Sequence, residues 1–92
     1  MATPKLKVGL IGCGGISQVH LEGWKRLNPE CQVVALCDIR KEPLDRRGEQ
    51  YGVPASQRYS SHREMLRQAD VDAVDICVPN MAHAPITIDA LK

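Results

Sequence analysis

Short apolar runs alternate with amphipathic stretches along this chain, and the alternation predicts strands and helices in turn. The runs at residues 5–11, 32–37 and 73–78 are almost continuously apolar, which is typical of strands covered on both faces. A shorter extended piece falls around Arg58 and Tyr59. The predicted helices occupy residues 15–27 and 42–51, a segment from 61 onward, and a segment from about 85 onward. This order indicates an α/β fold, with a parallel sheet of βαβαβ order that is incomplete at the C-terminus.

Signals for helix ends support these limits. Asn28 precedes Pro29, and the first helix ends there because a residue before proline avoids the helical region. Gly52 provides a left-handed cap for the second helix. Ser61 and Glu64 form a capping box at the start of the third. The apolar stripe of the first helix, which we expect to face the core, consists of Ile16, Val19, Gly23 and Leu27.

Size and composition narrow the classes of protein that fit. The 92 residues suit a single domain and are too few for a two-domain enzyme. The 12 basic and 11 acidic residues are interspersed, and the net charge of +1 provides no basic stripe for nucleic acid. No apolar run reaches the roughly 20 residues that cross a bilayer, and the first residues lack the apolar core of a secretory signal. We therefore expect no nucleic-acid or membrane partner and a cytoplasmic location.

The four cysteines are expected to be reduced and structural. They form no C-x-x-C pair and show no zinc-site spacing with a histidine, so no metal site is predicted. Cys37 and Cys77 lie within apolar runs, where a thiol behaves as a small hydrophobic group. Cys13 lies within a glycine turn, where its backbone matters more than its thiol. A redox-sensing thiol is the alternative interpretation of Cys13.

A glycine-rich turn follows the first predicted strand and opens the first predicted helix. Gly12 permits a tight turn at the end of the strand, and Gly14 has no side chain to block the approach of a phosphate. Gly15 leaves further space for a ligand. Ser17 takes the third position of the glycine pattern, where a small residue is needed because helix and sheet pack closely. Asp38 ends the second strand 21 residues after Ser17, close to the roughly 20 typical of a dinucleotide fingerprint. The pattern predicts that main-chain N–H groups bind a diphosphate and that the carboxylate binds the adenosine ribose.

The charges near this turn favour one dinucleotide over the other. Asp38 repels the 2′-phosphate of NADP, whereas Arg40 could accommodate it; we expect the carboxylate to dominate, so NAD is predicted and NADP is the weaker candidate. A glycine turn without a ligand, with Asp38 as an ordinary loop residue, is the alternative. S-adenosylmethionine is disfavoured because Leu10 stands where its enzymes tend to carry an acid.

Five stretches of the sequence form a combination more specific than the glycine turn alone. They are VGLIGCGGI at residues 8–16, VVALCD at 33–38, YGVP at 51–54, VDAVDICVPN at 71–80 and HAPI at 83–86. In this order they resemble the N-terminal domain of the Gfo/Idh/MocA oxidoreductase family, to which inositol dehydrogenases and glucose–fructose oxidoreductase belong. The resemblance covers nearly the whole chain from Lys7 and implies a Rossmann-like fold.

The resemblance also implies roles for particular residues toward the dinucleotide. Those implied at the diphosphate and the ribose are Gly12, Gly14, Ile16 and Asp38. Those implied in the loop on the nicotinamide side are Val78, Pro79, Asn80 and His83. Val78 stands where many members have threonine, which removes one hydroxyl. A helix-capping Asn80 and a packed or solvated His83 are the alternatives, and His20 is expected to be structural.

The chain is shorter than the members of this family. Its members continue into a strand with a Glu-Lys-Pro motif and then a second domain with the substrate pocket. We therefore expect residues 1–92 to be a partial dinucleotide-binding domain, without the substrate domain or a catalytic residue. The resemblance implies an NAD(P)-dependent oxidoreductase whose full-length form acts on a secondary alcohol of a sugar, cyclitol or related polyol. The alternatives are a non-catalytic dinucleotide-binding or interaction module and an inert truncated fragment, and the unpaired sheet edge favours a homo-oligomer.

Overall fold

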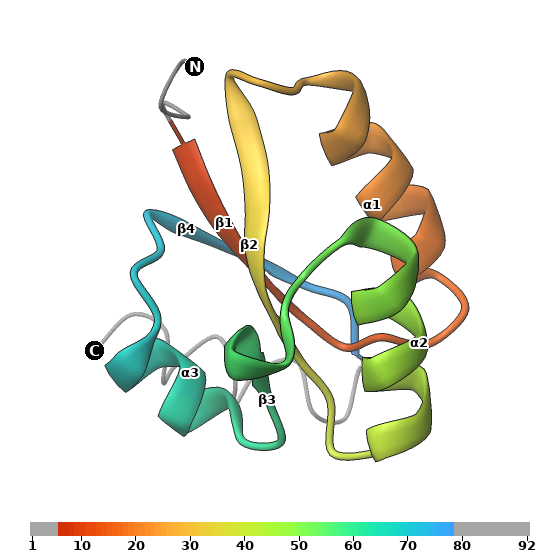
Figure 1. The fold of residues 1–92 in the computed structure, drawn as a ribbon, viewed down its shortest axis with the longest axis vertical. Helices are drawn as coiled ribbons and strands as arrows, with labels where there is room; N and C mark the ends of the chain where they lie inside the picture. Colours follow the sequence, from red (N-terminus) through yellow and green to blue (C-terminus); the bar gives the residue numbers. More distant parts are fainter. Residues whose placement is uncertain (1–5, 79–92) are drawn as a thin grey trace.

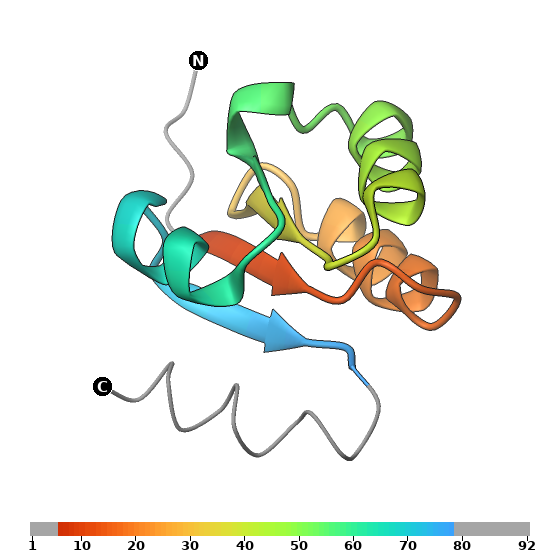
Figure 2. The ribbon, with the colours of Figure 1, turned by 90° about the horizontal axis from the view of Figure 1, so that it is seen from below.

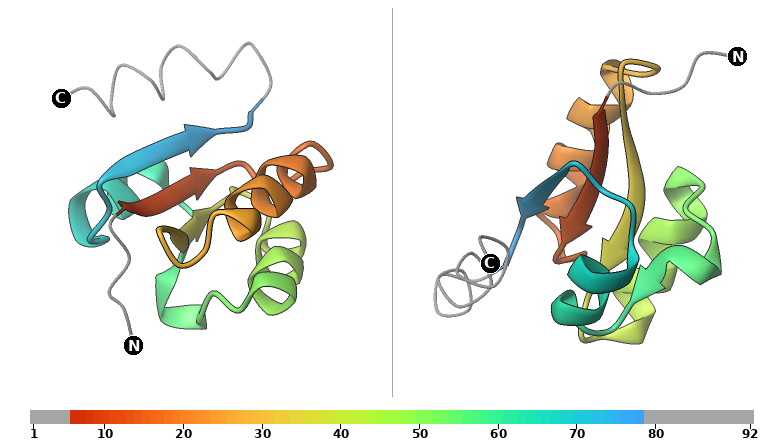
Figure 3. Two further views of the ribbon diagram at one scale, coloured as in Figure 1. Left: turned by 90° about the horizontal axis from the view of Figure 1, so that it is seen from above. Right: turned by 90° about the vertical axis from the view of Figure 1, so that its left-hand side faces the viewer.

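Four parallel strands form one sheet in the computed structural model, which describes residues 6–78 of the chain. The order across the sheet is β3-β2-β1-β4, so β1 lies between β2 and β4 (Figure 1, Figure 3). The strands are β1 (Leu6–Ile11), β2 (Cys31–Cys37), β3 (Arg58–Tyr59) and β4 (Ala73–Ile76). Each of the three neighbouring pairs is parallel. The predicted α/β fold is confirmed. The first three strands follow one another across the sheet from β1 to β3, and β4 is then added on the other side of β1.

Three α-helices and one short 3-10 helix connect these strands. They are α1 (Ser17–Arg26), α2 (Lys41–Tyr51), η1 (Ala55–Gln57) and α3 (His62–Gln68). The helices α1 and α2 lie side by side, whereas α3 lies apart from them (Figure 1, Figure 2). No helix of the described region is both long and apolar enough to span a membrane. The helix predicted from about residue 85 lies outside the described residues.

Two apolar clusters, one on each face of the sheet, hold the helices in place. The cluster under α1 and α2 contains Leu10, Cys13, Leu21, Leu36, Leu44 and Val53. The cluster under α3 contains Ile11, Ala35, Cys37 and Met65. Neighbouring residues of β1 and of β2 enter opposite clusters because side chains alternate between the faces of a strand. The central strands are therefore covered on both faces, as their continuous apolar sequence predicted.

The face of α1 that packs against the sheet differs from the predicted one. Ile16, Val19 and Leu27 are 58%, 68% and 51% exposed in the described part of the chain. The face toward the sheet consists of Ser17 and Leu21, which are buried, and His20 and Trp24, which are half-buried. Both stripes have helical spacing, so the pattern alone could not separate them. This stripe faces the sheet because Leu21 enters the apolar cluster there and the polar side chains have hydrogen-bond partners inside the fold.

The predicted helix ends agree with the structure. Gly52 ends α2 with a φ of 72°, in the left-handed region. Ser61 precedes α3, and its Oγ accepts a hydrogen bond from the Glu64 N–H at 3.4 Å. These ends direct the chain from α2 toward β3 and from β3 toward α3, and so they place the tip of β2 beside β3.

Candidate functional site

The glycine turn after β1 is held between the ends of the two neighbouring strands. Gly12 has a φ of +100°, which side chains disfavour, and its N–H donates to the Cys37 carbonyl at 2.7 Å. A Cβ on Gly12 would lie 2.4 Å from the Cys77 carbonyl oxygen. On the other side, the Cys77 N–H donates to the Ile11 carbonyl at 2.7 Å. The turn therefore lies at the C-terminal edge of the sheet, where ligands bind in folds of this type.

The space around the next two glycines is open. A Cβ on Gly14 would meet only an Arg40 guanidinium nitrogen, at 3.8 Å, and a Cβ on Gly15 would meet nothing within 4 Å. Ser17 begins α1 directly after this segment and is fully buried. Its Oγ donates to the Gly14 carbonyl at 2.6 Å. The glycines leave the main-chain N–H groups at the helix N-terminus accessible, and such groups suit an anion such as a diphosphate.

The carboxylate of Asp38, the residue that follows β2, lies against this turn. Its Oδ2 accepts the Cys13 N–H at 2.8 Å, and its Oδ1 accepts the Arg40 N–H at 2.8 Å. The Asp38 N–H donates to the Tyr59 carbonyl at 3.1 Å, so the neighbouring strand β3 fixes its backbone. The Asp38 side chain is 9% exposed. The geometry brings together the two parts of the dinucleotide pattern, although binding to a ribose stays a prediction.

Arg40 is positioned beside the same carboxylate. Its Nε is 3.8 Å from Asp38 Oδ1, and its side chain is 68% exposed. The guanidinium also lies next to Gly14, so this exposed arginine borders both the turn and the acid. Arg40 is therefore able to contribute to the choice between a ribose hydroxyl and a 2′-phosphate, and this role stays a prediction.

The predicted residues on the nicotinamide side are only partly described. Val78 is half-buried and packs against the cluster under α3. One of its methyl carbons would lie 3.0 Å from a Cβ on Gly12, so Val78 borders the glycine turn. Pro79, Asn80 and His83 lie outside the described residues, and their roles stay predictions.

Arg47 is a buried residue of this site that the sequence analysis did not identify. It belongs to α2 and is 8% exposed. Its Nε donates to Ser17 Oγ at 3.2 Å, and an Nη donates to the Gly14 carbonyl at 3.4 Å. The helix α2 thereby contacts the glycine turn directly. Only the helical spacing of Leu44 and Arg47, which share the buried face, could have indicated this contact.

A second polar cluster joins α1 to β4. The Asp75 carboxylate is hydrogen-bonded to His20 Nδ1 at 2.8 Å and to Trp24 Nε1 at 2.9 Å. The Cys77 thiol donates to the same carboxylate at 3.7 Å. The Asp75 side chain is 17% exposed. His20 and Trp24 thereby tie α1 to β4, and a structural role for His20 stays a prediction.

We expect Asp75→Asn to lower the free energy of unfolding by about 1–3 kcal/mol, because the amide has no negative charge to strengthen the hydrogen bonds with His20 and Trp24 and its NH2 group replaces the Oδ1 acceptor beside the Cys77 thiol. Urea unfolding followed by circular dichroism measures this loss. Glu49→Gln is the matched control: its carboxylate is 80% exposed and pairs with Arg58, so the change should stay within about 0.5 kcal/mol. Equal effects of the two substitutions would show that Asp75 does not support the fold.

The cysteines of the site are poor nucleophiles. Burial, together with the nearby Asp38 carboxylate, raises the pKa of the Cys13 thiol to about 12. Burial and the Asp75 carboxylate raise the pKa of Cys77 to about 12 in the same way. The Cys13 thiol donates to the Cys37 carbonyl at 3.6 Å. A protonated, buried thiol favours the structural interpretation of Cys13 over redox sensing.

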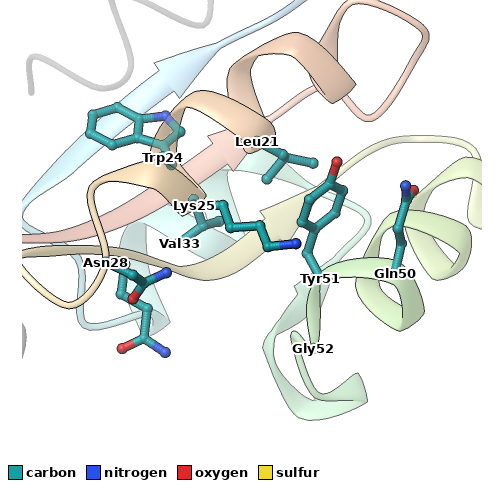
Figure 4. A pocket seen from close by; sticks show the side chains of 9 residues that line it. Leu21, Trp24, Lys25, Asn28, Val33, Gln50, Tyr51 and Gly52 are labelled. Atoms are coloured by element: carbon teal, nitrogen blue, oxygen red, sulfur yellow. The ribbon is translucent and has the colours of Figure 1, made fainter.

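A hollow of about 240 Å³ lies between α1 and α2, but it is not at the glycine turn (Figure 4). Trp24 lines it from the last turn of α1, Asn28 from the segment that follows this helix, and Val33 from the first half of β2. Tyr51, at the end of α2, closes another side, and its hydroxyl donates to Glu22 at 2.6 Å. This hollow is therefore separate from the dinucleotide pattern.

The chain belongs to the oxidoreductase family with an NAD-binding Rossmann fold, also called Gfo/Idh/MocA, whose sequence pattern matches residues 6–92. This match confirms the resemblance seen in the sequence, together with the Rossmann-like fold. The family is described as NAD-binding, which agrees with the cofactor that the sequence predicts.

Two curated relatives and one solved structure show the range of similar proteins. The chain is 31% identical to the glycosyl hydrolase family 109 protein 2 of Phocaeicola vulgatus, over 99% of this chain and 23% of that protein. It is 31% identical to the inositol 2-dehydrogenase of Salmonella paratyphi B, over 95% of this chain and 26% of that protein. The myo-inositol dehydrogenase of Lactobacillus casei, in complex with NAD(H) and myo-inositol, is 28% identical with a TM-score of 0.84, over 94% and 25% of the two chains. The chain thus spans about a quarter of the length of these proteins.

Proposed function

We propose that this chain forms the dinucleotide-binding part of an NAD-dependent oxidoreductase that acts on a secondary alcohol of a sugar, cyclitol or related polyol. The observation that carries the proposal is the contact between the Asp38 carboxylate and the Cys13 N–H within the glycine turn. It brings Asp38 and the glycine turn to one edge of the sheet, which supports the roles proposed for them toward the ribose and the diphosphate. We propose that residues 1–92 belong to an N-terminal domain of such an enzyme.

The residues of the turn fit this cofactor. The Cβ position of Gly14 faces open space bordered only by Arg40, and the N-terminus of α1 follows directly, so a diphosphate would bind to the backbone there. Asp38 would accept hydrogen bonds from the adenosine ribose, and Val78 would border the cofactor beside Gly12. Bound NAD supplies a hydride acceptor, while the chain's own residues bind and orient it.

The choice of substrate class rests on the relatives. The Salmonella protein and the Lactobacillus protein are named as inositol dehydrogenases, and both are similar to this chain over at least 94% of its length. The Phocaeicola protein is named as a glycosyl hydrolase. These names support a polyol or sugar substrate for the whole protein. A cytoplasmic location and a homo-oligomer stay predictions.

We expect NADH to stabilise the folded chain more than NADPH and S-adenosylmethionine to have no effect. A ligand that binds only the folded state at 100 times its dissociation constant adds about 2.7 kcal/mol to the free energy of unfolding. Thermal unfolding with each ligand in turn measures the difference. A larger shift with NADPH would overturn the choice of NAD. No shift with either nucleotide would instead favour an inert fragment or an interaction module.

A further inference from the structure

Arg47 is a buried cation, and within residues 6–78 its hydrogen-bond partners are all uncharged. Its guanidinium donates to the Ser17 hydroxyl, to the Gly14 carbonyl and, at 2.8 Å, to Gln50 Oε1. Arg58 shows the usual arrangement, since its side chain is 11% exposed and forms ion pairs with two carboxylates. A buried cation without a counter-charge is costly, and an anion bound nearby offsets that cost.

The position of this cation points to where such an anion binds. The Gly14 carbonyl accepts from both Arg47 and the Ser17 hydroxyl, so it is held away from the open side of the turn. Arg40 approaches Gly14 from the solvent side, and the N-terminus of α1 adds its partial positive charge. Three sources of positive potential therefore meet at the segment where the diphosphate is proposed to bind.

We propose that Arg47 is a positioning residue for the diphosphate of the dinucleotide. It acts in two ways, by fixing the orientation of the Gly14 carbonyl through hydrogen bonds and by adding a buried positive charge behind the turn. It does so from beneath the turn and does not contact the ligand. This role rests on the proposed function, because it requires a diphosphate at the turn.

The test compares ligands with and without the diphosphate. Binding of NADH, ADP and adenosine is measured by calorimetry on the purified chain and its variants. In Arg47→Met, we expect the dissociation constants of NADH and ADP to rise about tenfold, the effect of losing one charged interaction in a buried site. We expect adenosine binding to change much less, because it lacks the diphosphate. The dependence of ADP binding on salt should also weaken.

Two further variants separate this role from a general effect on folding. Arg46→Met removes the neighbouring arginine, which is 58% exposed and pairs with Glu42, and it should leave all three ligands unaffected. Arg47→Lys keeps the charge but not the planar hydrogen bonds, so it should recover part of the ADP affinity. Melting temperatures without ligand report any damage to the fold in each variant.

The outcomes distinguish this inference from the function on which it rests. If the unsubstituted chain binds neither NADH nor ADP, the proposed function fails and this role fails with it. If the unsubstituted chain binds them, and Arg47→Met weakens ADP and adenosine by the same factor, the positioning role is overturned alone. An effect no larger than that of Arg46→Met would overturn it as well.

Discussion

Replacing Gly12 by alanine is expected to destabilise the fold by at least about 3 kcal/mol and to abolish NADH binding. The reason is twofold, because its φ of +100° is strained for any side chain and the added Cβ would lie 2.4 Å from the Cys77 carbonyl oxygen. Relief of that contact has to move β4 or the turn, and both border the proposed site. Urea unfolding and an NADH titration measure the two effects.

Two other glycines provide matched controls for this substitution. A Cβ on Gly15 or on Gly23 would meet nothing within 4 Å, and neither residue has a positive φ. Gly23 lies within α1, so Gly23→Ala should stabilise the chain by up to about 1 kcal/mol through helix propensity. A Gly12→Ala chain as stable as Gly15→Ala would show that the turn relaxes freely, which contradicts the close approach of the Cys77 carbonyl oxygen.

The strands and most helix limits were predictable because local patterns determine them. Continuous apolar runs marked β1, β2 and β4, and the signals at Gly52 and Ser61 marked the end of α2 and the start of α3. The orientation of α1 was not predictable in this way. The face that it turns toward the sheet includes the half-buried His20, whose partner Asp75 lies 55 residues away, and no local pattern contains that information.

The candidate site likewise contains residues that the sequence predicts and one that it does not. The glycine turn and Asp38 follow a spacing with a known physical reason, so the sequence placed them together, and the structure has them in direct contact. Arg47 was missed because its partner Ser17 lies 30 residues earlier in the chain. A charged residue on the buried face of a helix usually indicates a partner in the fold, and this was the available signal.

Asp38→Ser is expected to weaken NADH binding at least about tenfold and to reduce the preference for NADH over NADPH. The serine removes a charged acceptor of ribose hydroxyl groups, and it removes the repulsion of a 2′-phosphate. Arg40 has its Nε 3.8 Å from Asp38 Oδ1, so it would then be free to pair with that phosphate. Calorimetric titration with both nucleotides measures the ratio of their dissociation constants.

Two variants show whether a change in the ratio of the two dissociation constants comes from lost recognition of the ribose or only from damage to the fold. Asp70→Ser removes an equal charge from a side chain that is 87% exposed and pairs with Lys7 at the other end of β1, so the ratio should not change. Asp38→Ser combined with Arg40→Ala should lose any gain in NADPH affinity, because the cation that accommodates the 2′-phosphate is gone. The hydrogen bond from the Cys13 N–H to Asp38 is lost in both Asp38 variants, so damage to the turn weakens the two nucleotides alike. An unchanged ratio in Asp38→Ser would therefore remove this carboxylate from the recognition of the ribose.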